Sequence, residues 1–369
     1  MSQELLASGV LGEKHMKKFK KIGVLTSGGD APGMNAAIRA VTRAAIAHGV
    51  EVLGIYRGYS GLINGDIKPL TLRDVSNIVN KGGTALFSDR CPEFKTEEGM
   101  RRAVETCKSF GIDGIVAIGG DGTFRGATDL TAHGIPCVGI PATIDNDISS
   151  TDNTIGFDTA MNTVIDLIDK LRDTCESHAR CNVVEVMGRG AGDIALHTGI
   201  ASGATASIIP EFEFDTDELC RKIAESRKIG KRNFIVIVSE GLGSEYGPAL
   251  TEKIEKVTNV ETRFARLSHI IRGGSPNLYD RVLASRMGVL AVEELIRGNS
   301  NLVVCEKSGE IVSVDINYAL VLDRMNKGKL KDGDLDAFTS EQIESMKAEI
   351  QRKREQTERL YSISKMINL

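Results

Sequence analysis

Three acidic residues lie in turns that directly follow apolar runs of the chain. Asp121 lies in the glycine-rich segment 119–123. Asp145 and Asp147 lie two positions apart, after a second apolar run. Carboxylates hold Mg²⁺, one of them can accept the proton of a hydroxyl group, and glycines let the backbone approach phosphate oxygens. These residues indicate magnesium-assisted phosphoryl transfer, although Asp and Asn are also common in ordinary turns.

Basic residues that could bind phosphate lie in glycine-rich segments or at the ends of predicted strands. Arg272 is followed by Gly273-Gly274-Ser275-Pro276, and an arginine beside glycines suits bidentate phosphate binding. An isolated arginine is more often a solvated surface residue, and a lone histidine is more often a satisfied core residue. The candidates are Arg90, Arg180, Arg189, Arg263, His269 and Arg272.

Short aliphatic runs alternate with stretches of helical period, which is typical of a mostly parallel α/β sheet. Glycine turns at 28–29, 119–120 and 188–190 each follow a predicted strand and open a predicted helix. In such sheets ligands bind beyond the carboxyl ends of the strands, and helix N-termini favour anions. We expect an α/β fold of two similar lobes that face one cleft, with mostly parallel sheets and helices on both faces.

The composition narrows the class of protein. The chain has 369 residues and a net charge of −4, so nothing in it favours nucleic acid or an anionic membrane as a partner. Seven cysteines without a C-x-x-C motif argue against disulfides and zinc, and they fit a cytoplasmic protein. The start of the chain lacks the order of a secretory signal, and no apolar run reaches the roughly 20 residues of a membrane span.

Several known nucleotide-binding patterns can be compared with the chain. The Walker pattern and a G-x-G-x-x-G after a strand are both missing from the sequence. The segment Gly119-Gly120-Asp121-Gly122-Thr123 is similar to one in diacylglycerol-type and NAD kinases, so alone it indicates a kinase without saying which. The segment 141–147 and the Arg272 segment argue against those two kinase classes.

Taken together, these motifs resemble the bacterial-type ATP-dependent 6-phosphofructokinases. The resemblance covers roughly residues 20–325. It rests on the segments 22–39, 118–122, 141–148, 154–157, 184–189 and 269–276. It implies transfer of a phosphoryl group from ATP, with Mg²⁺, to the 1-hydroxyl of fructose 6-phosphate. A pyrophosphate-dependent enzyme and a catalytically silent regulatory homologue are the alternatives; the presence of Asp121, Asp145 and Arg189 argues against a silent homologue.

The resemblance also implies roles for individual residues. Asp145 would be the general base, Asp147 would support the metal and the charge balance, and Arg189 and Thr143 would lie beside the transferring group. Asp121 would bind Mg²⁺. The nucleotide would contact Gly29, Arg90, Cys91, Asp121, Gly122 and Thr123. The sugar phosphate would contact Thr143, Asp145, Met187, Gly188, Arg189, Glu240, His269 and Arg272.

Domain organisation and assembly follow from the same resemblance. Arg180 and Arg263 would reach into a neighbouring subunit's site, which implies a homotetramer. We predict an N-terminal extension over 1–18, a nucleotide-binding lobe over 19–155 with 270–320, a sugar-phosphate-binding lobe over 156–269 with 321–345, and a C-terminal helical tail over 346–369.

Two regions of the sequence bear on regulation and on the phosphoryl donor. Arg39, Arg43, Arg172 and Lys231 match an interface pocket for anionic effectors, whereas Leu72, Thr205 and Ile229 replace the Arg, Glu and Lys expected there, so we expect weak or altered control. Pyrophosphate users typically carry an Asp and a Lys where this chain has Gly122 and Ala142. We therefore expect ATP as the donor.

Overall fold

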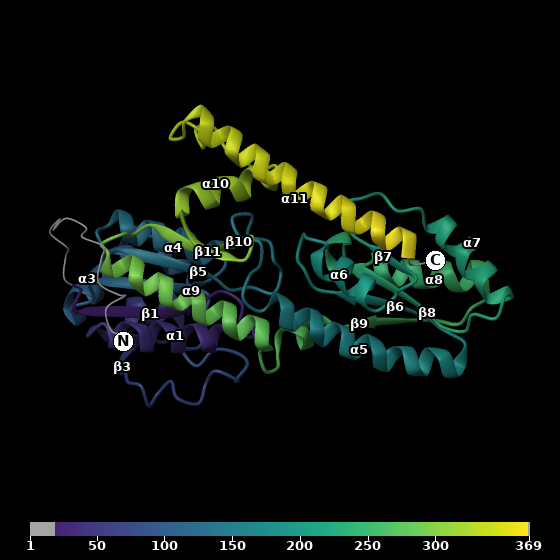
Figure 1. Cartoon of the computed structure of the whole chain (residues 1–369), viewed down its shortest axis with the longest axis horizontal. Helices are drawn as coiled ribbons and strands as arrows, with labels where there is room; N and C mark the ends of the chain where they lie inside the picture. The colour runs from purple at the N-terminus through teal and green to yellow at the C-terminus, as the bar shows by residue number, and fades with distance from the viewer. Residues whose placement is uncertain (1–18, 368–369) are drawn as a thin grey trace, which may run out of the picture.

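The computed structural model describes residues 19–367, so the predicted extension over 1–18 lies outside the described residues. The chain forms two lobes, and a long C-terminal helix lies across both of them (Figure 1). Among the described residues, no helix combines the length and the apolar character that crossing a membrane requires.

The larger lobe is built on a seven-stranded sheet with the strand order β11-β10-β5-β4-β1-β2-β3. The five central strands are parallel, and the edge strands β3 and β11 run antiparallel to their neighbours. The bounds are β1 Lys21–Ser27, β2 Glu51–Ile55, β3 Ile67–Leu70, β4 Gly114–Gly119, β5 Cys137–Pro141, β10 Leu302–Lys307 and β11 Glu310–Asp315. The central strands read as continuous apolar runs because both faces of the sheet are buried.

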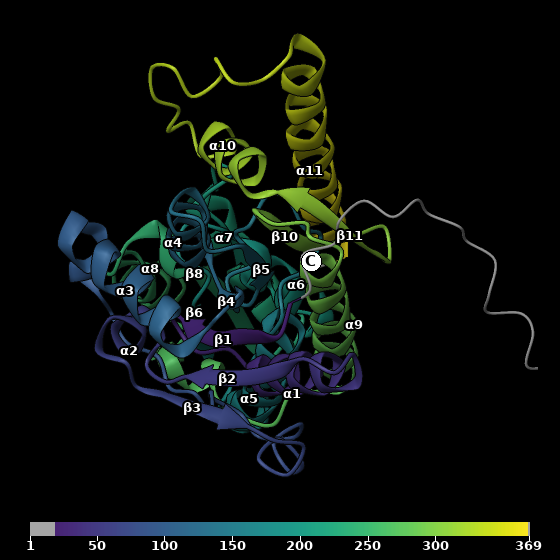
Figure 2. The ribbon, with the colours of Figure 1, turned by 90° about the vertical axis from the view of Figure 1, so that its left-hand side faces the viewer.

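Helices cover both faces of this sheet. On one face α1 (Met34–Ala47) packs against α9 (Leu278–Ile296). On the other face the core includes α2 (Gly58–Asn64), α3 (Glu97–Phe110) and α4 (Asp121–Ala132). Helix α10 (Ile316–Asn326) packs on α4 and β11, as the view onto the large lobe shows (Figure 2).

The smaller lobe has a four-stranded parallel sheet with the order β7-β8-β6-β9. Its strands are β6 Cys181–Val186, β7 Ala206–Ile208, β8 Phe234–Ser239 and β9 Thr262–Arg266. Helices α7 (Thr216–Lys228) and α8 (Tyr246–Thr258) cover one face, while α5 (Phe157–His178) and α6 (Asp193–Ala201) cover the other. One apolar cluster continues from α1 and α9 into α5 and α6, so the lobes share part of their core.

The predicted α/β class is confirmed, with mostly parallel sheets and helices on both faces. The two lobes differ in the number of strands, seven against four. The predicted tail over 346–369 falls largely in α11 (Ser340–Ile367), which begins earlier than expected, and residues 368–369 lie outside the described residues. The proposed lobe boundaries remain predictions.

Candidate active site

The loop that follows β5 carries the two acids that the sequence analysis singled out. The backbone N–H of Asp145 donates to Thr143 Oγ1 at 3.2 Å, and Asn146 adopts a positive φ of 51°. Thr154 Oγ1 donates to the Thr143 carbonyl at 2.6 Å, which ties the two sides of the loop together. The loop is therefore held by its own polar side chains, and it presents Asp145 and Asp147 beyond the end of the large sheet.

Asp145 combines burial with an incomplete set of partners. Its side chain is only 3% exposed, and its Oδ1 has no hydrogen-bond partner among residues 19–367. Its Oδ2 lies 3.4 Å from Arg189 Nη2, and Asp147 Oδ2 lies 3.3 Å from Arg189 Nη1. Burial raises the pKa of Asp145, Arg189 opposes this increase, and the charge of Asp147 adds to it. A carboxylate with a raised pKa and a free oxygen suits proton abstraction.

Arg189 comes from the smaller lobe, in the turn that follows β6. Glu240, at the carboxyl end of β8, accepts hydrogen bonds from the N–H groups of Gly188 at 3.2 Å and Arg189 at 2.7 Å. Met187 packs against the shared core at the same turn. Arg189 has a positive φ of 55° and a 68% exposed side chain, so its guanidinium projects from a fixed turn into the space beside Asp145.

Arg272 ends the short 3₁₀ helix η3 (Ser268–Arg272) and packs over the first glycine turn. Its Nη2 donates to the Asp30 carbonyl at 2.8 Å, and its Nε lies 3.4 Å from Asp30 Oδ1. A Cβ added at Gly29 would lie 1.9 Å from Arg272 Nη2, so this close approach requires glycine. His269 lies exposed on the same short helix. The charges of Arg272 and Glu240 both act on the pKa of Asp145, which places all three in one site.

The predicted nucleotide-binding residues gather at the carboxyl edge of the large sheet. Asp121, Gly122 and Thr123 form the first turn of α4, where Thr123 Oγ1 donates to the Ser27 carbonyl at 3.1 Å. A Cβ at Gly122 would meet nothing within 4 Å, so the space above this residue is open. Arg90 and Cys91 belong to the segment that precedes η1 (Pro92–Lys95). In the same segment the Ser88 hydroxyl donates a hydrogen bond to the Gly28 carbonyl.

Two predicted residues lie away from this cluster. Arg180 and Arg263 both pair with Glu261, and Arg180 Nε lies 2.8 Å from Glu261 Oε2. Both arginines lie near the amino end of the small sheet, because Arg263 pairs in register with Asn182 on β6. Arg189 follows the opposite end of this six-residue strand, about 20 Å along it. Within one chain, the two arginines therefore lie at the wrong end of the sheet to complete the site around Asp145.

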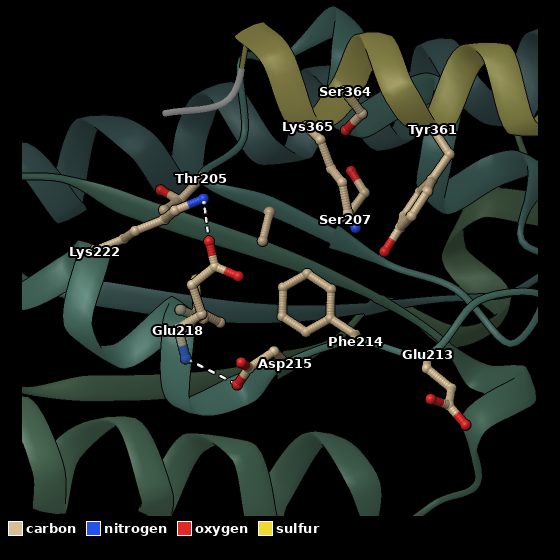
Figure 3. Close-up of a pocket in the computed structure, with 12 residues that line it drawn as sticks. Thr205, Ser207, Glu213, Phe214, Asp215, Glu218, Lys222, Tyr361, Ser364 and Lys365 are labelled. Atoms are coloured by element: carbon tan, nitrogen blue, oxygen red, sulfur yellow. Dashed lines mark hydrogen bonds and ion pairs between the residues drawn. The ribbon is translucent and has the colours of Figure 1, made fainter.

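The residues matched to an effector pocket are distributed over the two lobes of the chain. Arg39 and Arg43 lie on α1 of the larger lobe. Arg172 and Lys231 lie together in the smaller lobe, where burial lowers the pKa of Lys231 and the charge of Arg172 lowers it further. Thr205 instead lines a pocket of about 480 Å³ between α7 and the end of α11, together with Phe214, Glu218 and Tyr361 (Figure 3).

One cation of the site was missed by sequence reasoning. Lys327, the residue after α10, donates to the Asp147 carbonyl at 2.9 Å, and its Nζ lies 3.4 Å from Asp147 Oδ2. It lies 180 residues along the chain from its partner and just beyond the part covered by the resemblance. No motif of the sequence marks it.

The site has acids and an arginine that face each other beyond the ends of parallel strands. Glycine turns open helices beside them. This arrangement is typical of a phosphotransferase active site. The sequence model of the family described as "Phosphofructokinase" matches residues 21–295. The chain belongs to the phosphofructokinase family.

Similar proteins agree with this assignment. The ATP-dependent 6-phosphofructokinases of Bacillus pumilus and Bacillus subtilis are 58% and 56% identical over 298 residues, which are 81% of this chain and 93% of each relative. The structure of phosphofructokinase from Saccharomyces cerevisiae matches with a TM-score of 0.79 at 33% sequence identity. The match covers 86% of this chain and 47% of the yeast chain, so this chain spans about half of the yeast chain. A pyrophosphate-dependent phosphofructokinase from Marinobacter aquaeolei has a TM-score of 0.72 at 21% identity over 81% of this chain and 83% of that chain; it shares the fold.

Proposed function

We propose that this protein transfers the terminal phosphoryl group of ATP to the 1-hydroxyl of fructose 6-phosphate, giving fructose 1,6-bisphosphate and ADP in glycolysis. The observation that carries the proposal is the buried Asp145 carboxylate, which has one oxygen without a partner and lies 3.4 Å from Arg189. The names of the bacterial relatives support the same reaction.

In this reaction Asp145 takes the proton of the sugar hydroxyl as the oxygen attacks phosphorus. The transition state of phosphoryl transfer is loose, so catalysis depends on positioning and on positive charge near the transferring group. Arg189 supplies that charge from the smaller lobe, Thr143 lies beside it, and Asp147 balances the guanidinium. Met187, Gly188, Arg189, Glu240, His269 and Arg272 bind the sugar phosphate.

The nucleotide lies along the glycine turns of the large sheet. Gly29, Arg90, Cys91, Gly122 and Thr123 contact it. Asp121 is the proposed ligand of Mg²⁺, which neutralises phosphate charge when bound. Within residues 19–367, no group of three or more His, Cys, Asp or Glu side chains could hold a metal. This fits Mg²⁺, which is commonly held by one or two carboxylates together with waters and substrate phosphates.

A coupled assay for fructose 1,6-bisphosphate tests the function directly. With ATP, Mg²⁺ and fructose 6-phosphate, we expect product to form and to depend on all three components. Complete absence of product from the folded protein would favour the alternative of a catalytically silent regulatory homologue. Product with pyrophosphate alone would favour the pyrophosphate-dependent alternative.

The metal role of Asp121 gives a separate prediction. Asp121→Ala should raise the Mg²⁺ concentration needed for half-maximal rate by about tenfold or more, because it removes a direct charged ligand, and such contacts contribute about 1.5–3 kcal/mol. The measurement is a magnesium titration at fixed free ATP. Asp129 lies exposed further along α4, so Asp129→Ala is a matched control that should leave the titration nearly unchanged. An unchanged titration in Asp121→Ala would argue against the role.

Assembly gives another prediction. We propose a homotetramer in which Arg180 and Arg263 complete a neighbour's site, since within one chain both lie at the far end of the small sheet from Arg189. Mixing Asp145→Ser protein with Arg180→Ala protein should then restore activity in hybrid oligomers. No recovery after verified subunit exchange, or an active monomer in sedimentation, would show that each site lies within one chain.

Regulation is expected to depart from that of regulated relatives. An effector pocket made by Arg39 and Arg43 of one subunit with Arg172 and Lys231 of another would lack the charges replaced at Leu72, Thr205 and Ile229. Each lost charge-assisted contact is worth roughly 1.5–3 kcal/mol. Titration with ADP and phosphoenolpyruvate should therefore show weak effects, and strong activation by micromolar ADP would contradict this expectation.

The cysteines bear on the compartment. The seven cysteines are free thiols, and six of them are buried. Free thiols fit a reducing compartment, and we propose the cytoplasm.

A further inference from the structure

The C-terminal hairpin, which we define as α10, the following loop and α11, contacts the loop that carries Asp145. The family model ends at residue 295, so this hairpin (residues 316–367) lies beyond the matched segment. We propose that the C-terminal hairpin is a positioning element of the active site, which holds the segment 147–152 through Lys327 and Lys353. The inference rests on the proposed function for its consequence in catalysis.

The last turn of α10 makes the first set of contacts. Lys327 Nζ donates to the Asp147 carbonyl at 2.9 Å and approaches its carboxylate. The backbone N–H of Ser149 donates to Asp323 Oδ1 at 2.5 Å, and Asn326 Nδ2 donates to Ser149 Oγ at 3.2 Å. Three side chains at the end of α10 and just after it, those of Asp323, Asn326 and Lys327, thus hold two residues of the loop, Asp147 and Ser149.

Helix α11 makes the second set of contacts, further along the same loop. Lys353 Nζ donates to the carbonyl groups of Thr151 at 2.6 Å and Ile148 at 3.4 Å. Arg352 Nη2 donates to Asp152 Oδ1 at 2.8 Å. Burial lowers the pKa of Lys353, and surrounding acids, first Asp152, oppose this decrease. The half-buried Lys353 ammonium, bonded to two backbone carbonyls, fixes the turn that follows Asp145 and Asp147.

The same helix reaches the lobe that supplies Arg189. Asp193, at the start of α6, acts on the pKa of Lys353, and it follows the Arg189 turn by only four residues. Further along, α11 packs on α6, and Tyr361 stacks on Phe212 with 4.4 Å between ring centroids. The hairpin therefore connects the two segments whose side chains must meet, the Asp145 loop and the Arg189 turn.

The role of Lys327 follows from the charges around Asp147. Arg189 Nη1 and Lys327 Nζ both lie near Asp147 Oδ2, at 3.3 and 3.4 Å. Lys327 therefore shares the Asp147 carboxylate with Arg189, and by balancing part of that charge it leaves Arg189 more available to the transferring group. Without Lys327, Asp147 would pair with Arg189 alone, and a misplacement of about 1 Å at such a site costs up to roughly 100-fold in rate.

The test combines kinetics with a measurement that does not depend on the reaction. Lys327→Gln should lower kcat by about 10- to 100-fold with little change in the KM for ATP, and Lys327→Arg should restore most of the rate. In Asp147→Asn the further change Lys327→Gln should have a smaller effect than in the wild type, because the ion pair is already lost and only the bond to the Asp147 carbonyl remains. Lys329→Gln, two residues further and exposed, is the matched control and should behave as wild type.

Hydrogen exchange of the amides in 145–152 is the second measurement, made on the free protein. Exchange there should accelerate about tenfold or more in Lys327→Gln and in Lys353→Met, and not in the exposed control Lys347→Gln on α11. Unchanged exchange in both variants, or a wild-type kcat in Lys327→Gln, would overturn the proposal. A wild-type protein that makes no fructose 1,6-bisphosphate would instead refute the proposed function, and the exchange measurement would still decide whether the hairpin holds the loop.

Discussion

Asp145→Ser is expected to lower kcat by about 10²–10⁴-fold while the protein stays folded, because loss of a general base removes a contribution of this size. Asp145 is the one acid of the site that is almost fully buried and has an oxygen without a partner. The smaller, neutral serine removes a buried charge whose burial is unfavourable, so the substitution has no reason to unfold the chain. The measurement is kcat at saturating ATP and fructose 6-phosphate, with thermal unfolding as the check of the fold.

A matched control separates this effect from a general loss of charge. Asp166 lies exposed on α5, and within residues 19–367 its side chain forms an ion pair only with Lys170, four residues away. Asp166→Ser should therefore keep the wild-type kcat. A folded Asp145→Ser variant with nearly the wild-type kcat would remove Asp145 from the role of base.

The pH dependence of kcat reports on the same carboxylate. A general base must be ionised to accept a proton, so kcat falls as pH falls through the pKa of Asp145. Burial raises that pKa above the ordinary value of 3.8, more than Arg189 lowers it. The loss of activity on acidification should therefore begin at a higher pH than an exposed aspartate would give, and this acid limb should vanish from the residual activity of Asp145→Ser.

Much of the site could be predicted because its residues follow strands. Parallel strands end at one edge of a sheet, so turns after β1, β4 and β5 had to meet once the α/β pattern was recognised. Glu240, in contrast, was implied only by the family resemblance, and it lies beside the Arg189 turn because β6 and β8 are parallel neighbours. Local patterns of apolar runs and glycine turns therefore carried most of the information about the cluster around Asp145.

The parts that were missed depend on contacts between distant segments. Lys327 and Lys353 meet the Asp145 loop across 180 to 205 residues, and neither belongs to a motif. The start of α11 did have a local signal: Thr339 and Gln342 exchange hydrogen bonds as a capping box, which marks a helix start at 340. The antiparallel edge strand β11 was also missed, because its half-buried residues lack the continuous apolar run of the central strands.

The choice of phosphoryl donor depends on two small residues of the site. The space above Gly122 is open, so a nucleotide phosphate can approach its backbone there, whereas an Asp would place a negative charge in that space. Ala142 is 1% exposed and packs in the core beside Ile144 and Ile155. Its methyl group therefore points into the protein interior, and it brings no cation to hold pyrophosphate.

We expect kcat/KM to be higher with ATP than with pyrophosphate in the same assay, and a higher value with pyrophosphate would overturn the choice of donor. Gly122→Asp should lower kcat/KM for ATP by about 10- to 150-fold, because the repulsion is comparable to losing a charge-assisted contact of about 1.5–3 kcal/mol. Gly122→Ala is the matched control, since the alanine methyl group would enter open space without a charge.

The double variant Gly122→Asp with Ala142→Lys is a further test. Ala142→Lys would place an ammonium in the core, so thermal unfolding must first show that the double variant is folded. In a folded double variant, use of ATP should fall far more than any activity with pyrophosphate, and an equal loss with both donors would show that these positions do not distinguish them.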